Sequence, residues 1–287
     1  MTQDTLTDAR PEPAFAPSAR PTGLLLRVLP TGAYVGRANM LVRRAWLVNR
    51  RAWMTVVSGF FEPVFYLLAL GVGFGRLVSH VVGPGGVSIT YTAFVAPALL
   101  AASAMNGAVF DSTFNIFHKL KYVKLYDSIL ATPLGPVDIA LGEISWALLR
   151  GALYAAGFLT VMTAMGLITS PWGLLALPAA LLIALAFASI GMAATTFMRS
   201  WQDFDLVNLA ILPMFFFSTT FYPLTVYPGW LRVVVQCFPL YHGVALMRAL
   251  TTGFVGWGLL WHVLYFVVMA AIGLTAAGRR LRTLLLK

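Results

Sequence analysis

The chain has 287 residues, a formal net charge of +10 and a mean hydropathy of +0.81; 59% of its residues are hydrophobic and 10% are charged. Soluble domains carry roughly 25% charged residues, so the composition excludes an ordinary water-soluble domain and indicates a membrane protein. The basic residues lie between apolar segments rather than in one patch, which argues against nucleic acid as a partner. Cys237 is the only cysteine, which excludes an intrachain disulfide.

The amino-terminal part of the chain contains two different segments. Residues 1–23 are polar and rich in Pro and Ala, and they are expected to form a disordered cytoplasmic tail. Residues 24–53 are basic, and Met40, Leu41 and Trp46 recur among the arginines at helical spacing. This pattern predicts an amphipathic helix in the cytoplasmic membrane interface. A basic stop before the first span is the alternative.

Six apolar segments follow, each close to the roughly 20 residues that a bilayer core requires. The expected spans are residues 54–77, 91–114, 138–167, 172–197, 206–222 and 255–277. Between the last two, residues 223–254 are apolar but repeatedly interrupted by proline and glycine. We expect one or two short re-entrant helices there, buried against other parts of the protein. The predicted fold is an all-α protein with six transmembrane helices.

The distribution of basic residues predicts the orientation of these spans. If the amino terminus lies inside the cell, sixteen basic residues fall on the cytoplasmic side. Arg76, Arg232 and Arg248 fall outside, and Arg150 falls within the third span. Arginine and lysine accumulate on the cytoplasmic side of membrane proteins, so both termini are expected in the cytoplasm.

Three charged residues within the expected spans are candidates for a substrate path or for gating. Glu62 precedes Pro63 in the first span; it either contacts substrate or holds a neighbouring helix. Glu143 and Arg150 lie on one face of the third span, about 10 Å apart. At that distance we expect each to pair with another helix. For these two, a structural clamp is favoured over contact with substrate.

The segment after the second span, residues 115–134, predicts a short amphipathic helix on the cytoplasmic side. Phe117, Leu120, Lys121 and Lys124 recur at helical intervals, and Pro133 ends the helix. Such a helix either lies on the membrane surface or docks in a groove of a partner. The residues alone leave these alternatives open.

No catalytic or metal-binding pattern is found. The chain contains no Gly-Lys dipeptide, which excludes a phosphate-binding loop, and no serine elbow. Its four histidines are scattered without metal-ligand spacing. Asp203 and Asp205 are expected at a solvated helix start. Gly142 and Gly151 are expected to allow close approach of neighbouring helices.

Several stretches together resemble the ABC-2 type permeases, and especially the branch of nodulation protein J and the daunorubicin-resistance permeases. The resemblance runs from about Arg43 to the carboxyl terminus. The stretches that carry it are residues 62–71, 96–106, 131–134, 138–144, 221–224 and 238–240.

This resemblance implies properties that the residue patterns do not show. Such permeases have six spans, an amphipathic connecting helix before the first and re-entrant outer helices before the last. Two copies pair, as a homodimer or a heterodimer, and two separate ATPase subunits bind ATP and Mg²⁺ below them. The segment after the second span then acts as a coupling helix. The implied ATPase-coupling residues are Phe117, Lys121, Lys124, Tyr126, Leu130, Thr132 and Pro133.

The function expected from these features is that of a permease subunit of an exporter in the bacterial plasma membrane. Its cargo is an amphiphile, such as a drug, a lipid or a lipid-linked glycan, that moves along the first, second and fifth spans. The chain itself binds no cofactor. The main alternative is a membrane-embedded enzyme that modifies lipids or glycans. A scaffold without transport activity and a secondary transporter are weaker alternatives.

Overall fold

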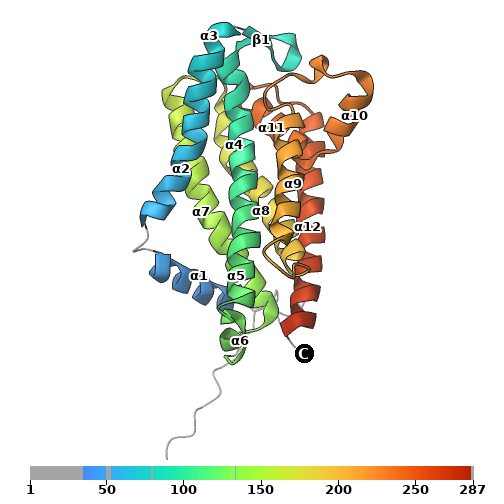
Figure 1. Ribbon diagram of the computed structural model, residues 1–287. Helices are drawn as coiled ribbons and strands as arrows, with labels where there is room; N and C mark the ends of the chain where they lie inside the picture. Colours follow the sequence, from blue (N-terminus) through green and yellow to red (C-terminus); the bar gives the residue numbers. More distant parts are fainter. Residues whose placement is uncertain (1–34, 50–52, 79, 133, 286–287) are drawn as a thin grey trace, which may run out of the picture.

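The protein is a bundle of long helices in a computed structural model that describes residues 35–49, 53–78, 80–132 and 134–285 (Figure 1). The predicted tail, residues 1–23, therefore lies outside the described residues. The elements in chain order are α1 (Val35–Asn49), α2 (Trp53–Leu68), η2 (Ala69–Phe74), α3 (Gly75–Leu77), β1 (His80–Val82), η3 (Pro84–Gly86), β2 (Ser88–Thr90), α4 (Tyr91–Phe110), η4 (Asp111–Asn115), α5 (Ile116–Lys121), α6 (Leu125–Leu130), α7 (Pro136–Ala164), η5 (Pro171–Leu175), α8 (Ala176–Thr195), α9 (Asp203–Phe217), η6 (Leu224–Val226), α10 (Gly229–Cys237), α11 (Pro239–Thr252) and α12 (Gly258–Leu285).

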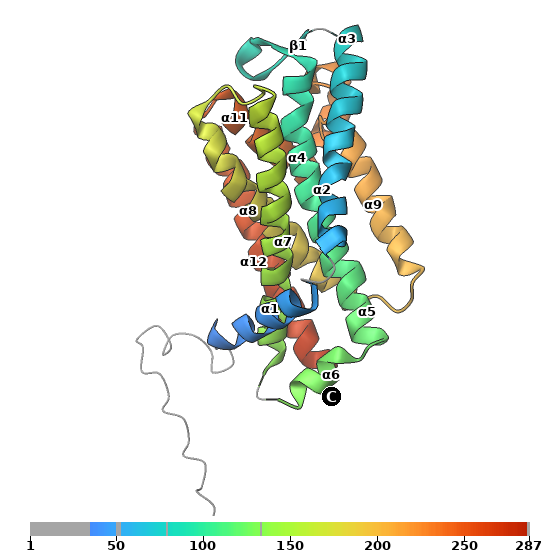
Figure 2. The same ribbon diagram turned by 90° about the vertical axis from the view of Figure 1, so that its left-hand side faces the viewer.

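The bundle has two distinct ends (Figure 1). The terminal end is defined by α1, α6 and the carboxyl terminus. The hairpin end is defined by β1 and β2, an antiparallel pair that aligns His80 with Thr90. Helix α1 lies across the long axis at the terminal end, whereas α2, α4, α7, α8, α9 and α12 run along that axis (Figures 1 and 2). Helix α1 lies within residues 24–53, for which the sequence predicts an interfacial helix.

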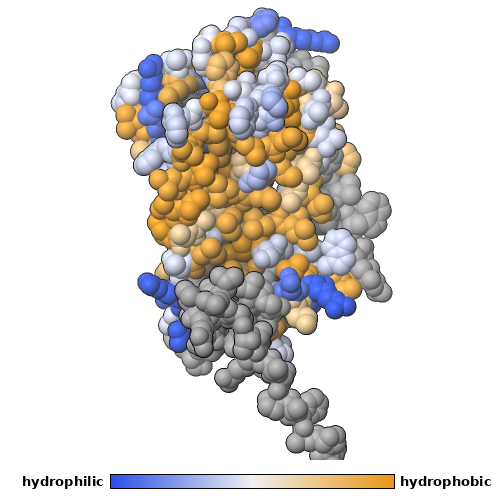
Figure 3. Space-filling model, turned by 180° about the vertical axis from the view of Figure 1, so that it is seen from behind, coloured by the Kyte–Doolittle hydropathy of each residue, from blue (hydrophilic) through white to orange (hydrophobic). Residues whose placement is uncertain are grey.

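The predicted membrane spans agree with the structure in part. Four helical stretches are long and apolar enough to cross a bilayer: Tyr91–Lys121, Pro136–Ala164, Pro171–Thr195 and Gly258–Leu284. The bent pair of α10 and α11 adds a fifth if it counts as one span. The chain is therefore an all-α multi-pass protein apart from the β1–β2 hairpin. Figure 3 shows the matching hydrophobic band between two more hydrophilic ends.

The predicted fifth span is longer than the helix that forms there. Helix α9 has 15 residues and ends at Phe217, whereas the sequence predicts a span to residue 222. After Phe217 the backbone is no longer helical: Ser218 lies outside the helical region, and Thr219 takes a left-handed conformation with φ 58°. Six membrane crossings remain a prediction.

Helix α8 is the centre of the bundle and packs against α4, α7 and α12. Small side chains permit these contacts, as they do in other membrane helix packings. At Gly273 in α12, an added Cβ would lie 2.7 Å from backbone atoms of Ser189 and Ile190. At Gly142 in α7, it would lie 2.7 Å from the Cβ of Leu41 in α1. The expectation of close approach is confirmed at Gly142, but Gly151 has nothing within 4 Å.

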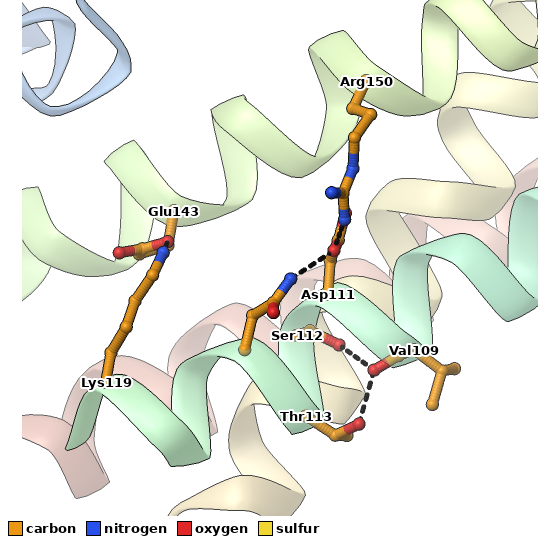
Figure 4. A network of polar contacts seen from close by, with 8 residues as sticks. Val109, Asp111, Ser112, Thr113, Lys119, Glu143 and Arg150 are labelled. Carbon is orange, nitrogen blue, oxygen red and sulfur yellow. Dashed lines mark hydrogen bonds and ion pairs between the residues drawn. The ribbon is translucent and has the colours of Figure 1, made fainter. Parts of the chain in front are cut away.

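Helix α4 continues into η4, a π-helical segment that is tied to α8. The Thr195 hydroxyl of α8 donates a hydrogen bond of 2.9 Å to the Ser112 carbonyl, which a regular helix would use internally. The Ser112 and Thr113 hydroxyls both donate to the Val109 carbonyl (Figure 4). π-Helical turns occur often at functional sites, and this one carries Asp111.

The interrupted segment 223–254 forms two helices, α10 and α11, that meet at an angle of 87°. Pro239 begins α11, and Gly253 ends it with a left-handed φ of 85°. Arg248 of α11 is buried, in keeping with the expectation that this segment packs against other parts of the protein. Its guanidinium donates to the Phe94 and Thr219 carbonyls and covers the Phe94 ring at 3.7 Å.

Candidate functional site

A large cleft lies between α2, α4, α7 and α9, with a volume of about 1000 Å³. Helices α2, α4 and α9 correspond to the first, second and fifth expected spans, where the sequence predicts the substrate path. Helix α7, which corresponds to the third expected span, also lines the cleft. Most of the wall is apolar or aromatic. The side chains that give it this character include Pro63, Tyr66, Leu99, Val109, Phe110, Phe114, Tyr154, Trp201, Phe204, Val207, Ile211, Leu212, Phe215 and Phe216.

Few polar groups interrupt this apolar wall. Glu62 of α2 lines the cleft, and its exposed side chain forms no hydrogen bond or ion pair with any residue that the structure describes. Asn106 of α4 and Asn208 of α9 add amide groups to the same cleft. An unpaired carboxylate within a membrane-spanning segment is costly unless water or a ligand solvates it. Glu62 is therefore available to a molecule in the cleft.

The other charged side chain of the cleft, Arg150, is paired. Its guanidinium forms an ion pair with Asp111, whose side chain is 7% exposed (Figure 4). Asn115 donates a further hydrogen bond of 2.7 Å to Asp111. The prediction that Arg150 pairs with another helix is confirmed. Its partner was missed by sequence analysis, although an aspartate near the end of an expected span is a signal in itself.

Glu143 lies on α7 outside the cleft lining. Its carboxylate accepts a hydrogen bond of 2.6 Å from the ammonium group of Lys119 in α5 (Figure 4). This ion pair joins α7 to the segment after α4, as the clamp interpretation of Glu143 predicts. Its Lys119 side chain is 28% exposed, so the pair is closer to solvent than the Asp111–Arg150 pair.

The segment at residues 115–134 forms two short helices instead of the single helix that its spacing predicts. Helix α5 ends at Lys121, and α6 begins at Leu125. Between them, Lys124 adopts a left-handed φ of 48°, which a continuous helix does not permit. The predicted helix end at Pro133 lies outside the described residues.

The predicted coupling residues divide into exposed and buried groups. Lys121, Lys124 and Thr132 are exposed, and Leu130 is half-buried. Phe117 and Tyr126 are each only 1% exposed and pack inside their own chain, so in this structure neither offers its side chain to a partner. The helical spacing identifies Phe117 but does not reveal that its partner is the bundle itself, and Tyr126 came only from the family resemblance.

Tyr126 fills the space between α6 and the terminal end of the bundle. Its neighbours in the same apolar cluster include Leu41 of α1, Ile139 of α7 and Leu281 of α12. Burial raises the pKa of the Tyr126 hydroxyl well above its usual value, and the negative charge of Glu143 raises this pKa further. The side chain therefore stays neutral and anchors α6.

An aromatic cluster connects this segment to α9. The Phe117 ring lies 5.3 Å from both Trp201 and Phe204, and Tyr122 lies 5.4 Å from Trp201. Phe114 also contacts Trp201 at 5.0 Å. Trp201 and Phe204 line the cleft as well, so these ring contacts join α5 to the cleft wall.

Asp203 is the first residue of α9, and its carboxylate holds the turn that leads into the helix. The Asp203 carboxylate accepts backbone hydrogen bonds of 2.6 Å from Arg199 and 3.2 Å from Ser200. These hydrogen bonds lower the pKa of Asp203 below its usual value. The predicted helix start is confirmed, because α9 begins at Asp203.

The residues that the structure describes include no group of three or more His, Cys, Asp or Glu side chains that could hold a metal ion. Two of the four histidines, however, are not scattered. His242 and His262 meet in the folded chain, although 20 residues separate them.

Comparisons with known proteins agree with the membrane architecture. A family model described as ABC-2 type transporter matches residues 38–252. Nodulation protein J of Rhizobium leguminosarum bv. trifolii is 35% identical over 213 residues, which cover 74% of this chain and 79% of the relative. The protein of that name from Rhizobium meliloti (strain 1021) is 31% identical over 214 residues, covering 72% and 80%. That from Rhizobium leguminosarum bv. viciae is 32% identical over 230 residues, covering 78% and 85%.

Proposed function

The chain belongs to the ABC-2 type transporter family, and on that premise we propose that it is the permease subunit of an ATP-driven exporter of an amphiphile. Family membership supports a transmembrane transport subunit. The exporter assignment rests on the cleft of about 1000 Å³, because its mainly apolar wall fits a hydrocarbon or aromatic body. Glu62 and the two asparagines would bind the polar part of the same molecule.

In this proposal, ATP and Mg²⁺ are bound by two separate ATPase subunits at the terminal end, which faces the bacterial cytoplasm. Lys121 and Lys124 are exposed there and would contact the ATPase. The aromatic cluster around Trp201 would then carry the movement of α5 to α9, and the ion pair of Lys119 and Glu143 would carry it to α7. A second copy of the chain would close the open side of the cleft.

The alternative of a membrane-embedded enzyme requires several reactive polar groups at one depth. Among the described residues that line the cleft, the charged side chains are Glu62 and Arg150, and Arg150 is already paired with Asp111. Glu143 is held by Lys119. This arrangement supplies one free carboxylate, so it supports binding of a cargo better than catalysis.

The proposed coupling is tested by reversing the two exposed lysine charges with the double variant Lys121→Glu and Lys124→Glu. The permease is purified in mild detergent from its own bacterium, and the co-purified ATPase is quantified by mass spectrometry. We expect ATPase recovery to fall about tenfold, which corresponds to about 1.4 kcal/mol of binding free energy, while the amount of permease is unchanged.

Arg76→Glu is the matched control, because Arg76 is also exposed but belongs to the opposite, hairpin end. It should leave ATPase recovery at the wild-type level. Equal recovery from the double lysine variant would remove these lysines from the docking surface. Absence of any ATPase from the wild-type preparation would contradict the proposed function itself.

A further inference from the structure

Two histidines form a direct contact near the hairpin end of the bundle. Nδ1 of His242 in α11 lies 2.8 Å from Nδ1 of His262 in α12. The His242 side chain is buried, and the Tyr265 ring stacks on it at 4.2 Å. Tyr241 contacts both imidazoles edge-on, at 5.5 Å and 6.4 Å. The aromatic rings therefore hold the two imidazoles in a fixed mutual position.

A distance of 2.8 Å between two Nδ1 atoms requires one proton between them. In the neutral pair, one histidine donates its Nδ1–H and the other accepts it at its unprotonated Nδ1. A first additional proton can bind Nε2 of the donor ring, and the hydrogen bond survives. A second must bind the accepting Nδ1, so two N–H donors and two positive charges then face each other. The contact therefore holds with no or one additional proton and breaks with two.

The surroundings provide no negative charge to stabilise the doubly protonated pair. The sequence contains no Asp or Glu from residue 206 to the end, so α10, α11 and α12 carry none. Helix α8 has no titratable side chain, and the acidic residues of α9, Asp203 and Asp205, belong to its opposite end. Asp111 follows the last residue of α4 and is paired with Arg150. Helix α7 also packs against α12, but its carboxylates, Asp138 and Glu143, lie within its first eight residues at the terminal end, and Glu143 is paired with Lys119.

The remaining titratable groups near the pair are neutral or positive. Tyr241 and Tyr265 contact it, and Cys237 is the last residue of α10, five residues before His242 in the chain. Arg232 of α10 and Arg248 of α11 are bonded to backbone carbonyls and add positive charge. Tyr91 is the titratable residue in the first turn of α4. Repulsion within a doubly protonated pair would therefore be uncompensated.

Protons can reach the pair from the hairpin end. His262 is the fifth residue of α12, about 6 Å along the axis from the start of that helix. The preceding loop is exposed, and Trp257 has an exposed fraction of 88%. His262 itself is half-buried. The site is therefore close to the aqueous surface, although His242 is enclosed.

We propose that His242 and His262 form a proton-binding site that clamps α11 to α12 and releases it when the second proton binds. Release would affect the cleft, because Arg248 of the same helix holds the Thr219 carbonyl directly after α9. Acidification on the side of the hairpin end thus loosens the outer support of α9. This site requires neither an ATPase nor a particular cargo, so its failure would not contradict the exporter assignment.

The experiment uses Cys237 as a built-in reporter, because it is the only cysteine and is exposed beside the pair. The full chain in lipid nanodiscs is labelled at neutral pH with an environment-sensitive fluorophore. Its emission is then followed from about pH 8 to about pH 4, the range in which histidines take up protons. We expect a reversible step in emission for the wild-type chain, and its loss in His242→Gln and in His262→Gln.

His118→Gln is the matched control, because this exposed histidine lies at the terminal end and should leave the step unchanged. Should His242→Gln fail to fold because it is buried, the half-buried His262 provides the decisive variant. Hydrogen exchange of α11 in the unlabelled protein is measured in parallel and should rise across the same step. A flat response of the wild-type chain, or an unchanged step in His262→Gln, overturns the proposal.

Discussion

Helices α8 and α9 are both strongly apolar, yet the bundle buries them very differently. In α8, thirteen of twenty residues are buried, whereas in α9 only Met214 of fifteen is buried. Their compositions explain the contrast. Helix α8 contains eight alanines, together with Gly191 and Ser189, and small side chains let neighbouring helices approach closely. Helix α9 contains four phenylalanines and three leucines, which project from its surface.

Side-chain size, rather than hydrophobicity, distinguishes the buried central helix α8 from α9, which lines the cleft. The bulky face of α9 borders the cleft and is otherwise uncovered, with Leu206 and Leu209 more than 60% exposed. The helix is held mainly near its two ends, by the aromatic cluster around Trp201 and by Arg248 at Thr219. We therefore expect α8 to act as a rigid support and α9 to act as a movable wall.

The largest expected effect is at the contact of α8 with α12. A side chain at Gly273 would meet the backbone of Ser189 and Ile190, which cannot move aside without separating the helices. Gly273→Leu is therefore expected to abolish folding or to lower stability by more than the ~1–3 kcal/mol typical of overpacking. Gly278→Leu is the control in the same helix, because a Cβ there has open space. Monodisperse yield and thermal unfolding in detergent compare the two variants, and equal behaviour would contradict this packing.

Truncating one large side chain in each helix should have very different effects on stability. Ile183 of α8 is fully buried, so Ile183→Ala should lower the free energy of unfolding by about 3 kcal/mol. Leu209 of α9 is 67% exposed, so Leu209→Ala should change it by less than about 0.5 kcal/mol. Unfolding in detergent measures both. If Leu209→Ala instead lowers the oligomeric mass, the exposed face of α9 is an interface between copies; equal destabilisation by both variants would refute the contrast.

The sequence predicts where the helices lie better than it predicts which residues contact each other between helices. Long apolar runs give the spans, and the prolines and glycines of residues 223–254 show that this segment is interrupted, because both signals are local. The pairing of Arg150 with another helix is also predictable, since an unpaired charge within the membrane is costly. That its partner is Asp111 depends on how α4 and α7 rotate against each other, which no local pattern contains.

The errors at the coupling segment have the same origin. The apolar spacing of Phe117 identifies a packing face, but an apolar stripe fits its own bundle as well as a partner protein. The break between α5 and α6 arises at Lys124, a residue type without any preference for the left-handed conformation. The contact of His242 with His262 similarly depends on the fold of α11 against α12, so the sequence shows only two unrelated histidines.

A smaller destabilisation is expected at the Asp111–Arg150 pair, which joins η4, at the end of α4, to α7. Removing one partner of a buried ion pair costs about 3–5 kcal/mol. Because the Arg150 side chain is 17% exposed toward the cleft, water reduces this cost, and we expect Asp111→Asn to destabilise the protein by about 2 kcal/mol. Glu143→Gln should cost less, because the Lys119–Glu143 pair is more exposed.

A double variant separates the ion pair from the packing of the same side chains. Adding Arg150→Gln to Asp111→Asn removes the unpaired buried charge, so the double variant should be more stable than Asp111→Asn alone. Chemical unfolding of the four proteins, including the wild type, gives the coupling free energy. Additive losses would mean that the two side chains act independently and that the ion pair does not hold the end of α4 to α7.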